Sequence, residues 1–150
     1  MIGVISDTHG LLRPEATAAL QGVEHILHAG DVGDPAILEA LRAIAPVTAI
    51  RGNIDEHGPC SFLPAMEVAT LDGHSFYLLH DRQALDLDPV AAGFGAVISG
   101  HSHRPLIEWH RGVLYLNPGS AGPRRFTLPI SLALLTIGED GLQPQLVTLL

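Results

Sequence analysis

Short apolar runs alternate with polar loops in the first third of the chain, and this pattern predicts a parallel sheet. Pro14 stands where a first helical turn would begin, and Glu15–Leu20 continues as a helix. Asp34 is an N-cap followed by proline, and the helix that it begins runs to about Ala43. A β-α-β-α-β order is typical of parallel strands covered by helices. The three runs that we expect to form strands are Ile2–Ile5, Glu24–Ala29 and Val47–Ile50.

The second half of the chain predicts hairpins, because turn residues separate pairs of apolar segments. Asp72-Gly73 is the strongest short hairpin signal, and His110-Arg111-Gly112 and Glu139-Asp140-Gly141 separate two further pairs. A short helix is expected at Pro89–Ala92 and another strand at Ala96–Ser99. The pattern favours a mixed sheet, or two sheets packed face to face, with helices outside. The hairpin pairs are Met66–Leu71 with His74–Leu79, Leu106–Trp109 with Val113–Leu116, and Ser131–Ile137 with Leu142–Leu149.

Composition narrows the class of protein. With 150 residues, 47% of them hydrophobic and 16% charged, the chain can bury a core as one domain over residues 1–150, and extensive disorder is excluded. Cys60 is the single cysteine, which excludes a disulfide scaffold and a cysteine-rich zinc module. The net charge of −8, with no lysine, argues against stable nucleic-acid binding. No membrane span or signal peptide is evident, so we expect a cytoplasmic protein.

Seven potential metal ligands follow the predicted strands. Ligands of open α/β sheets bind outside the carboxyl ends of the strands, so these residues are expected to converge. In extended backbone the alternate residues of Asp7-Thr8-His9 and His101-Ser102-His103 would each project to one side. Imidazoles with carboxylates suit transition metals, and two such metals can share a carboxylate, bind a phosphoryl group and activate water. The seven residues are Asp7, His9, Asp31, Asn53, His80, His101 and His103.

Each candidate also has an ordinary structural explanation when it is considered alone. Asp7 and His9 could belong to a helix-capping loop, and Asp31 and Asn53 could be turn residues. The occurrence of all seven in register favours metal binding. His28 is expected in the core or in support of the ligands rather than as a ligand. We expect surface positions for His25, His57, His74, His110, Arg124 and Arg125.

Five motifs and the single residue His80 follow one another in order along the chain. They are Asp7-Thr8-His9-Gly10, His28-Ala29-Gly30-Asp31, Arg51-Gly52-Asn53-Ile54-Asp55, His80, Gly100-His101-Ser102-His103 and Asn117-Pro118-Gly119-Ser120. Together these residues give the chain a resemblance to the calcineurin-like metallophosphoesterase superfamily. More narrowly, it is similar to the small single-domain bacterial and archaeal phosphodiesterases. The resemblance runs from residue 7 to residue 120, most of the chain.

The resemblance implies an α/β fold, in which two mixed β-sheets pack as a sandwich flanked by helices, and a dinuclear centre. Asp31 would bridge two divalent transition-metal ions, with manganese expected first and nickel, cobalt, iron or zinc as alternatives. A metal-bridging water or hydroxide would be the nucleophile, and Asp31, His101 and Asn53 are assigned the catalytic role. Asp7, His9 and His103 would hold the first metal, and Asn53, His80 and His101 the second.

The function implied is hydrolysis of small phosphate esters, with diesters favoured. The alternatives are a phosphomonoesterase and a non-catalytic scaffold, since a retromer subunit with this fold is an interaction protein. A flavodoxin-like nucleotide binder ranks last, because no glycine-rich phosphate loop follows the first strand. Exposed strand edges make a homodimer an expected assembly.

Two positions depart from the family pattern. Many larger relatives carry a histidine after the metal-binding Asn that protonates the leaving group, and here that position is Ile54. Without such an acid, roughly 10²–10⁴-fold of rate is lost on poor leaving groups, unless His57 or water replaces it. Asp81 and Arg82 follow His80, where relatives often carry Gly and His. Asp81 is expected to orient His80, and Arg82 to meet a substrate phosphate or to lie in solvent.

Overall fold

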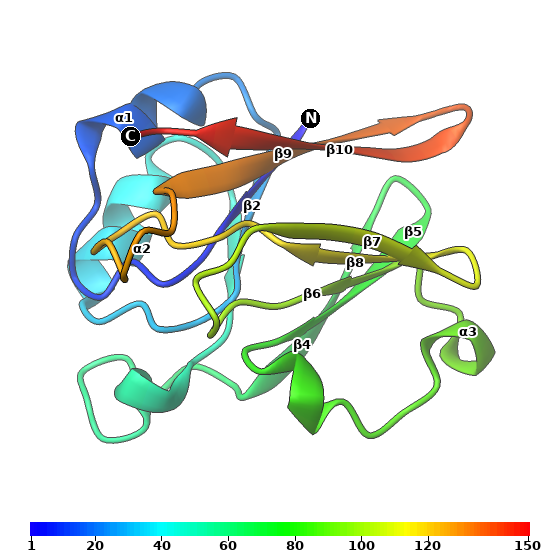
Figure 1. Ribbon diagram of the computed structural model, residues 1–150, viewed down its shortest axis with the longest axis horizontal. Coiled ribbons are helices and arrows are strands. Elements are labelled where there is room, and N and C mark those ends of the chain that lie inside the picture. The colour runs from blue at the N-terminus through cyan, green and yellow to red at the C-terminus, as the bar shows by residue number, and fades with distance from the viewer.

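The computed structural model describes residues 1–150 and contains two five-stranded sheets packed face to face (Figure 1). In the first sheet, three neighbouring strands that reach one edge are parallel, and the two strands on the other side pair antiparallel. In spatial order its strands are β10 (Gly141–Thr148), β9 (Ser131–Gly138), β1 (Ile2–Ile5), β2 (His25–His28) and β3 (Val47–Ala49). In the second they are β4 (Met66–Leu71), β5 (His74–Leu79), β6 (Ala96–Ile98), β8 (Val113–Asn117) and β7 (Leu106–His110).

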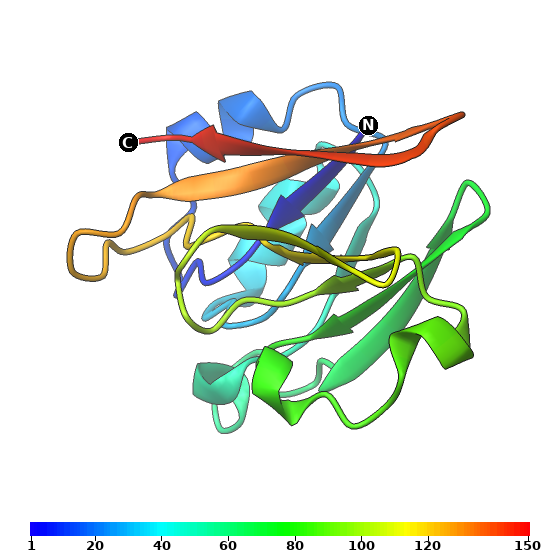
Figure 2. The ribbon, with the colours of Figure 1, turned by 45° about the vertical axis from the view of Figure 1, so that its right-hand side comes forward.

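Helices and helical turns cover the outer faces of this sandwich (Figure 2). The helices α1 (Pro14–Ala19) and α2 (Pro35–Arg42) lie on the first sheet, and the segment with α3 (Pro89–Ala92) lies on the second. The largest apolar cluster fills the space between the sheets and includes Val4, Phe76 and Leu116. The predicted fold of two mixed sheets flanked by helices is therefore confirmed.

Local sequence signals account for most element boundaries. The Asp34 side chain accepts a hydrogen bond from the Ala36 amide at 2.9 Å, as expected of an N-cap before proline. Asp72 and Gly73 both have positive φ, at 50° and 79°, which is the geometry that a two-residue hairpin turn requires. All ten predicted strands form, and β7, β8 and β9 each continue one residue further than expected, to His110, Asn117 and Gly138.

The parallel strands place their carboxyl ends at one end of the sandwich. β1, β2 and β3 are parallel in the first sheet, and β5, β6 and β8 are parallel in the second. Loops after these strands therefore meet, and they carry the polar motifs of the sequence. None of the helices is both long enough and apolar enough to cross a membrane.

Candidate metal centre

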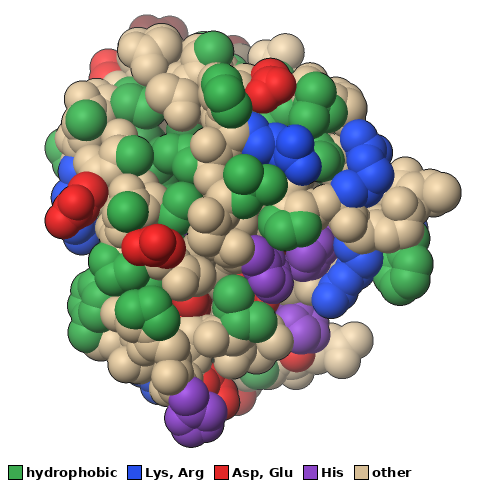
Figure 3. Space-filling view, turned by 90° about the vertical axis from the view of Figure 1, so that its left-hand side faces the viewer, with side chains coloured by type: hydrophobic (Ala, Val, Ile, Leu, Met, Phe, Trp, Pro, Cys, Tyr) green, Lys and Arg blue, Asp and Glu red, His purple; other side chains and the backbone are tan.

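Histidine side chains gather in a hollow at the end of the sandwich where the parallel strands finish, bordered by basic side chains (Figure 3). Asp7 and His9 follow β1, and Asp31 follows β2. Asn53 begins the 3₁₀ turn η1 (Asn53–Asp55) after β3, and His80 directly follows β5. Both remaining histidines come from the loop after β6. The seven predicted ligands thus reach one hollow from five different loops.

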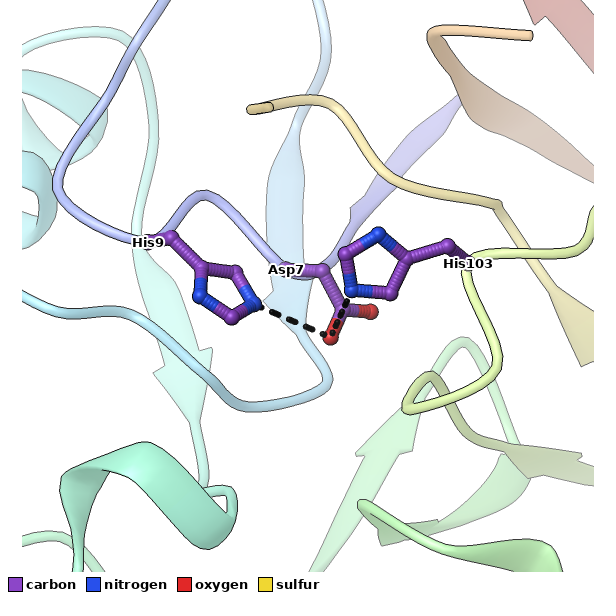
Figure 4. Close-up of side chains that lie close together, drawn as sticks. All are labelled: Asp7, His9 and His103. Atoms are coloured by element: carbon purple, nitrogen blue, oxygen red, sulfur yellow. Dashed lines mark ion pairs between the residues drawn. The ribbon is translucent and has the colours of Figure 1, made fainter. Parts of the chain in front are cut away.

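Asp7 is the centre of the first group of ligands (Figure 4). Its carboxylate is fully buried, and its Oδ1 lies 3.8 Å from His9 Nε2 and 3.5 Å from His103 Nε2. The other oxygen, Oδ2, accepts hydrogen bonds from the Ser6 hydroxyl at 2.8 Å and from the His101 amide at 3.2 Å. One oxygen of Asp7 is therefore held by the protein, and the other faces the histidines.

Asp31 lies between histidines of the two predicted ligand sets. Its Oδ2 is 3.3 Å from His9 Nε2 and 3.2 Å from His80 Nε2, while its Oδ1 accepts from the Ile54 amide at 3.0 Å. His80 Nδ1 donates to the Ala29 carbonyl at 2.7 Å, so Nε2 presents its lone pair to the carboxylates. This position agrees with the bridging role expected of Asp31. Asp7 Oδ1 also lies 3.7 Å from His80 Nε2, so it too is near both sets.

His101 and Asn53 lie on the open side of the hollow. Both side chains are exposed, and His101 Nδ1 is 3.2 Å from Asn53 Oδ1. The His101 ring stands edge-on to the His80 ring, with centroids 5.2 Å apart. These contacts join the outer pair to the buried carboxylates, so all seven predicted residues form one connected cluster.

The buried members of this cluster fit a metal. Asp7 Oδ1, His9 Nε2 and His80 Nε2 are buried side-chain atoms without a hydrogen-bond partner. Buried polar atoms are normally paired, and leaving them unpaired costs about 1–3 kcal/mol each. Two groups have the spacing of metal ligands, Asp7 with His9 and His103, and Asp7 with Asp31 and His80. A cation at each group would be bound by oxygen and nitrogen atoms that have no partner within the protein.

The backbone that presents these ligands differs from the prediction. Alternate residues in extended backbone were expected to project together, but five of the seven ligands have left-handed backbone. Non-glycine residues adopt this region rarely, and each does so at a cost of about 1–3 kcal/mol. The chain turns sharply at each ligand, and these turns bring side chains from separate loops together. The five are Asp7 (φ 57°), His9 (48°), Asp31 (57°), His101 (71°) and His103 (59°).

Glycines beside the carboxylates allow the loops to approach closely. A Cβ at Gly52 would overlap the Asp31 carboxylate, and one at Gly100 would lie 2.7 Å from Asp7 Oδ2. Only glycine leaves room for a neighbouring backbone at this separation. The glycines of the sequence motifs therefore set how near the ligand loops can lie.

Two supporting residues hold the ligand loops in place. Asp55 is buried, and its carboxylate accepts from the amides of Val32, Gly33 and Gly52 at 2.9–3.0 Å. It thereby ties the loop after β2 to the loop after β3. No role was predicted for Asp55 from the sequence, although its place in the Arg51–Asp55 motif marked it.

His28 is the second supporting residue, and its burial and contacts confirm the expected position in the core, beneath the ligands. It is fully buried beneath the loops, and its Nδ1 accepts from the Gly30 amide at 3.1 Å. Its Nε2 therefore carries the hydrogen and donates to Thr8 Oγ1 at 3.0 Å, and that hydroxyl donates to the Val32 carbonyl. Burial lowers the pKa of His28 to about 4, so the ring stays neutral.

Asp81 does not have the role expected of it. The Ala29 carbonyl, not Asp81, accepts from His80, and the Asp81 side chain instead accepts from the Gln83 amide at 3.0 Å. It caps the 3₁₀ turn η2 (Arg82–Ala84).

Some of the remaining polar residues lie where the sequence predicted, and others do not. Arg82 forms an ion pair with Glu108 at 3.2 Å and is not free in solvent. His57 and His110 are exposed as predicted, whereas His25 and His74 are half-buried. Arg124 and Arg125 are exposed, as expected. Asn117, left open between a turn and a site role, donates to the Gly100 carbonyl at 2.9 Å and so supports the His101 loop.

The carboxylates and histidines of the cluster shift one another's pKa values. Contact with Asp31, and then with Asp7, raises the pKa of His9 to about 9. Burial is the strongest single influence on His80 and lowers its pKa, but contact with Asp31 and the charges of Asp7 and Asp31 together outweigh burial, so the net pKa is raised. Burial of Asp31 acts to raise its pKa, but His80 and His9 hold it well below its usual range. Burial, helped by the charges of Arg125 and His9, lowers the pKa of His103.

We expect metal binding at pH 7 to release protons. His9 has a pKa of about 9 in the metal-free protein, so it is protonated at pH 7 and must lose its proton to ligate a metal. Affinity for Mn²⁺ should therefore fall about tenfold per pH unit below 9 for this one proton. Calorimetric titration with Mn²⁺ in two buffers of different ionisation enthalpy should show at least one proton released. The exposed His57→Ala variant should release the same number, and the absence of release in the wild type would contradict this assignment.

Comparisons with known proteins agree with this geometry. Residues 1–140 match the family model of the calcineurin-like phosphoesterase superfamily domain. A protein named "Probable metallophosphoesterase" from Methanothermobacter thermautotrophicus is 38% identical over 151 residues, covering 93% of this chain and 87% of that protein.

Solved structures are similar in fold. The structure of an archaeal phosphodiesterase matches with a TM-score of 0.76 and 22% identity, covering 97% of this chain and 99% of that chain. Zinc-bound Vps29 from Entamoeba histolytica matches with a TM-score of 0.75 and 22% identity, covering 99% of both chains.

Proposed function

This chain belongs to the calcineurin-like phosphoesterase superfamily, and we propose that it is a phosphodiesterase with two divalent transition-metal ions, manganese first. The observation that carries the proposal is the set of buried atoms without partners, Asp7 Oδ1, His9 Nε2 and His80 Nε2, which face one another in the hollow. The similar archaeal phosphodiesterase gives the proposal its reaction class, and the zinc-bound Vps29 shows that a protein of this fold can bind a transition metal.

The seven residues would form two sets of metal ligands. Asp7, His9 and His103 would hold one metal, His80, His101 and Asn53 the other, and Asp31 would bridge them. Such metals supply an activated water as nucleophile and neutralise charge on the phosphoryl group. The Ala29 carbonyl keeps the His80 tautomer fixed, and the Ile54 amide orients the Asp31 carboxylate. We expect no covalent enzyme intermediate, because the nucleophile would be this activated water.

A scaffold function is the second candidate, because several similar structures are Vps29 proteins, from the vacuolar protein sorting system. The presence of all seven ligands favours an enzyme over a scaffold. A protein that binds Mn²⁺ and hydrolyses no phosphate ester would support the scaffold instead. Three expectations from the sequence stay predictions: a small phosphate-ester substrate, a cytoplasmic location and a homodimer.

Diesters should be hydrolysed with a higher kcat/KM than monoesters. A monoester dianion brings a second charge towards Asp81, because Asp81 lines the same surface hollows as the candidate ligand His101. At this exposure the repulsion is worth at most about 1 kcal/mol, so the preference should be a few-fold. The measurement compares bis(4-nitrophenyl) phosphate with 4-nitrophenyl phosphate under Mn²⁺.

The Asp81→Gly variant should reduce the ratio of kcat/KM for the diester to kcat/KM for the monoester. Asp140→Asn, a charge change in the turn between β9 and β10, serves as the matched control and should leave it unchanged. A higher kcat/KM of the wild type for the monoester would contradict the proposed phosphodiesterase activity and indicate a phosphatase.

Rates should fall steeply as the leaving group becomes more basic. Ile54 occupies the position of the acid in larger relatives, and its exposed side chain cannot donate a proton, although its amide donates to the Asp31 carboxylate. A series of aryl phosphodiesters of rising phenol pKa should therefore show a steep dependence of kcat on that pKa. Introducing Ile54→His should flatten the series and raise rates on the poorest leaving group by up to about 10²-fold. Ile54→Gln is the polar control without an acid, and an already flat wild-type series would reveal another proton donor.

A further inference from the structure

Two hollows flank His101 and differ in charge. The first, of about 300 Å³, contains the side chains of Arg82 and Arg104 against one carboxylate, Asp81. The second, of about 420 Å³, contains one arginine, Arg51, against three carboxylates. Both hollows share Asp81 and His101 in their walls, so they meet at the metal centre from two sides. The three carboxylates of the second are Glu56, Asp81 and Asp86.

The first hollow is polar and presents its cations in defined positions. Leu106 is its only hydrophobic residue. The Arg82 guanidinium lies over the Tyr115 ring at 4.3 Å and forms two hydrogen bonds with Glu108, at 3.2 and 3.3 Å. These bonds use one hydrogen on each terminal nitrogen, so the other three N–H donors of Arg82 remain for a ligand.

Arg104 is the second cation of this hollow and follows the ligand His103 directly. Its amide donates to Ser102 Oγ at 3.2 Å, and Asn117 Nδ2 donates to the same hydroxyl at 3.1 Å. The side chain is exposed and has no ion-pair partner. The loop that carries it is thus held by the sheet, while its charge is available to an anion.

The second hollow has the opposite character. Arg51 donates to the Leu63 carbonyl at 2.8 Å, and the remaining charges are negative. An anionic group would be repelled there and attracted to the first hollow. The two ester arms of a diester bound at the metals would therefore be distinguished by charge.

We propose that the hollow containing Arg82 and Arg104 binds a second phosphate group, carried on one arm of the diester substrate. The proposal rests on the proposed phosphodiesterase function and narrows its substrate class to diesters with a remote phosphate. Guanidinium groups bind phosphate through paired N–H donors, and two of them can contact different oxygens of one phosphate.

The test compares two substrates with the same leaving group and the same scissile phosphorus. Thymidine 5′-(4-nitrophenyl phosphate) lacks a remote phosphate, and its 3′-phosphorylated form carries one. Release of 4-nitrophenolate by the Mn²⁺-loaded protein is measured for both, and the readout is the ratio of their kcat/KM values. The wild type should prefer the 3′-phosphorylated ester by about tenfold or more.

Variants assign this preference to the hollow. Arg82→Ala and Arg104→Ala should each bring the ratio towards one, whereas Glu108→Gln should raise it, because it frees Arg82 from its counterion. A general loss of structure would not lower the ratio of kcat/KM values in one variant and raise it in a variant of the paired residue. Arg111→Ala, in the turn between β7 and β8, makes the same change in net charge and should leave the ratio unchanged.

The outcomes separate this proposal from the proposed function. A wild-type ratio of one or less, or a ratio unaffected by both arginine variants, overturns the phosphate subsite and leaves the phosphodiesterase standing. If neither ester is hydrolysed, the proposed function fails, and calorimetry then tests the hollow by binding alone. Thymidine 3′,5′-bisphosphate should bind the Mn²⁺-loaded protein more tightly than thymidine 5′-monophosphate, and Arg104→Ala should remove the difference. Equal affinities in the wild type would overturn the subsite.

Discussion

Asp31→Asn should remove both metals and lower kcat/KM on an aryl diester by about 10²–10³-fold or more. The Asp31 Oδ2 atom lies 3.2–3.3 Å from Nε2 of both His9 and His80, one histidine from each predicted ligand set. An amide keeps the size of the side chain but removes the negative charge that both metals would share. Elemental analysis after Mn²⁺ loading, together with initial rates, measures the effect.

Asp7→Asn is the matched control for this prediction. Asp7 also lies near both sets, but its Oδ2 is occupied by Ser6 and by the His101 amide. We expect Asp7→Asn to retain one metal, the one held by His80, and to lose the other. If Asp7→Asn loses both metals and Asp31→Asn retains one, Asp7 is the bridge and the assignment reverses.

Asp55→Ala should be the most destabilising substitution near the centre that touches no ligand side chain. It leaves the buried amides of Val32 and Gly52, and the half-buried amide of Gly33, without their acceptor. Unpaired buried groups cost about 1–3 kcal/mol each, so the free energy of unfolding should fall by about 3–5 kcal/mol. For a domain of this size Tm should fall by about 10 °C or more, which differential scanning calorimetry of the metal-free protein measures.

Asp34→Ala provides the comparison for this effect. Asp34 also accepts a backbone hydrogen bond, from Ala36, but at the exposed N-terminus of α2. Loss of such a cap costs about 1 kcal/mol. A Tm decrease in Asp55→Ala no larger than that in Asp34→Ala would show that water replaces the lost acceptor. The Asp55 hydrogen bonds between the loops after β2 and β3 would then contribute little to the free energy of unfolding.

Local signals made the fold predictable from the sequence. Asp34 with Pro35 fixes where α2 begins, and Asp72 with Gly73 fixes the turn between β4 and β5, since neighbouring residues supply each interaction. The end of the sheet that carries the site was also predictable. It follows from strand direction, and the polar residues after each parallel strand needed no tertiary detail to be grouped.

Contacts between distant residues could not be predicted in the same way. Asp55 accepts from amides 22 and 23 residues earlier, and Arg82 pairs with Glu108, 26 residues later. Nothing near Asp55 or Arg82 in sequence specifies such partners. The left-handed backbone of Asp7 and His9 was missed because residue type favours extended or helical backbone there, and tertiary packing overrides that preference.

Anomalous diffraction from crystals of the Mn²⁺-loaded protein would show whether Asp31 lies between two metals. We expect two peaks about 3.5–4 Å apart. One should be beside Asp7, His9 and His103, the other beside Asn53, His80 and His101, with the Asp31 carboxylate contacting both. A single peak, or two peaks with Asp31 bound to only one of them, would contradict this expectation.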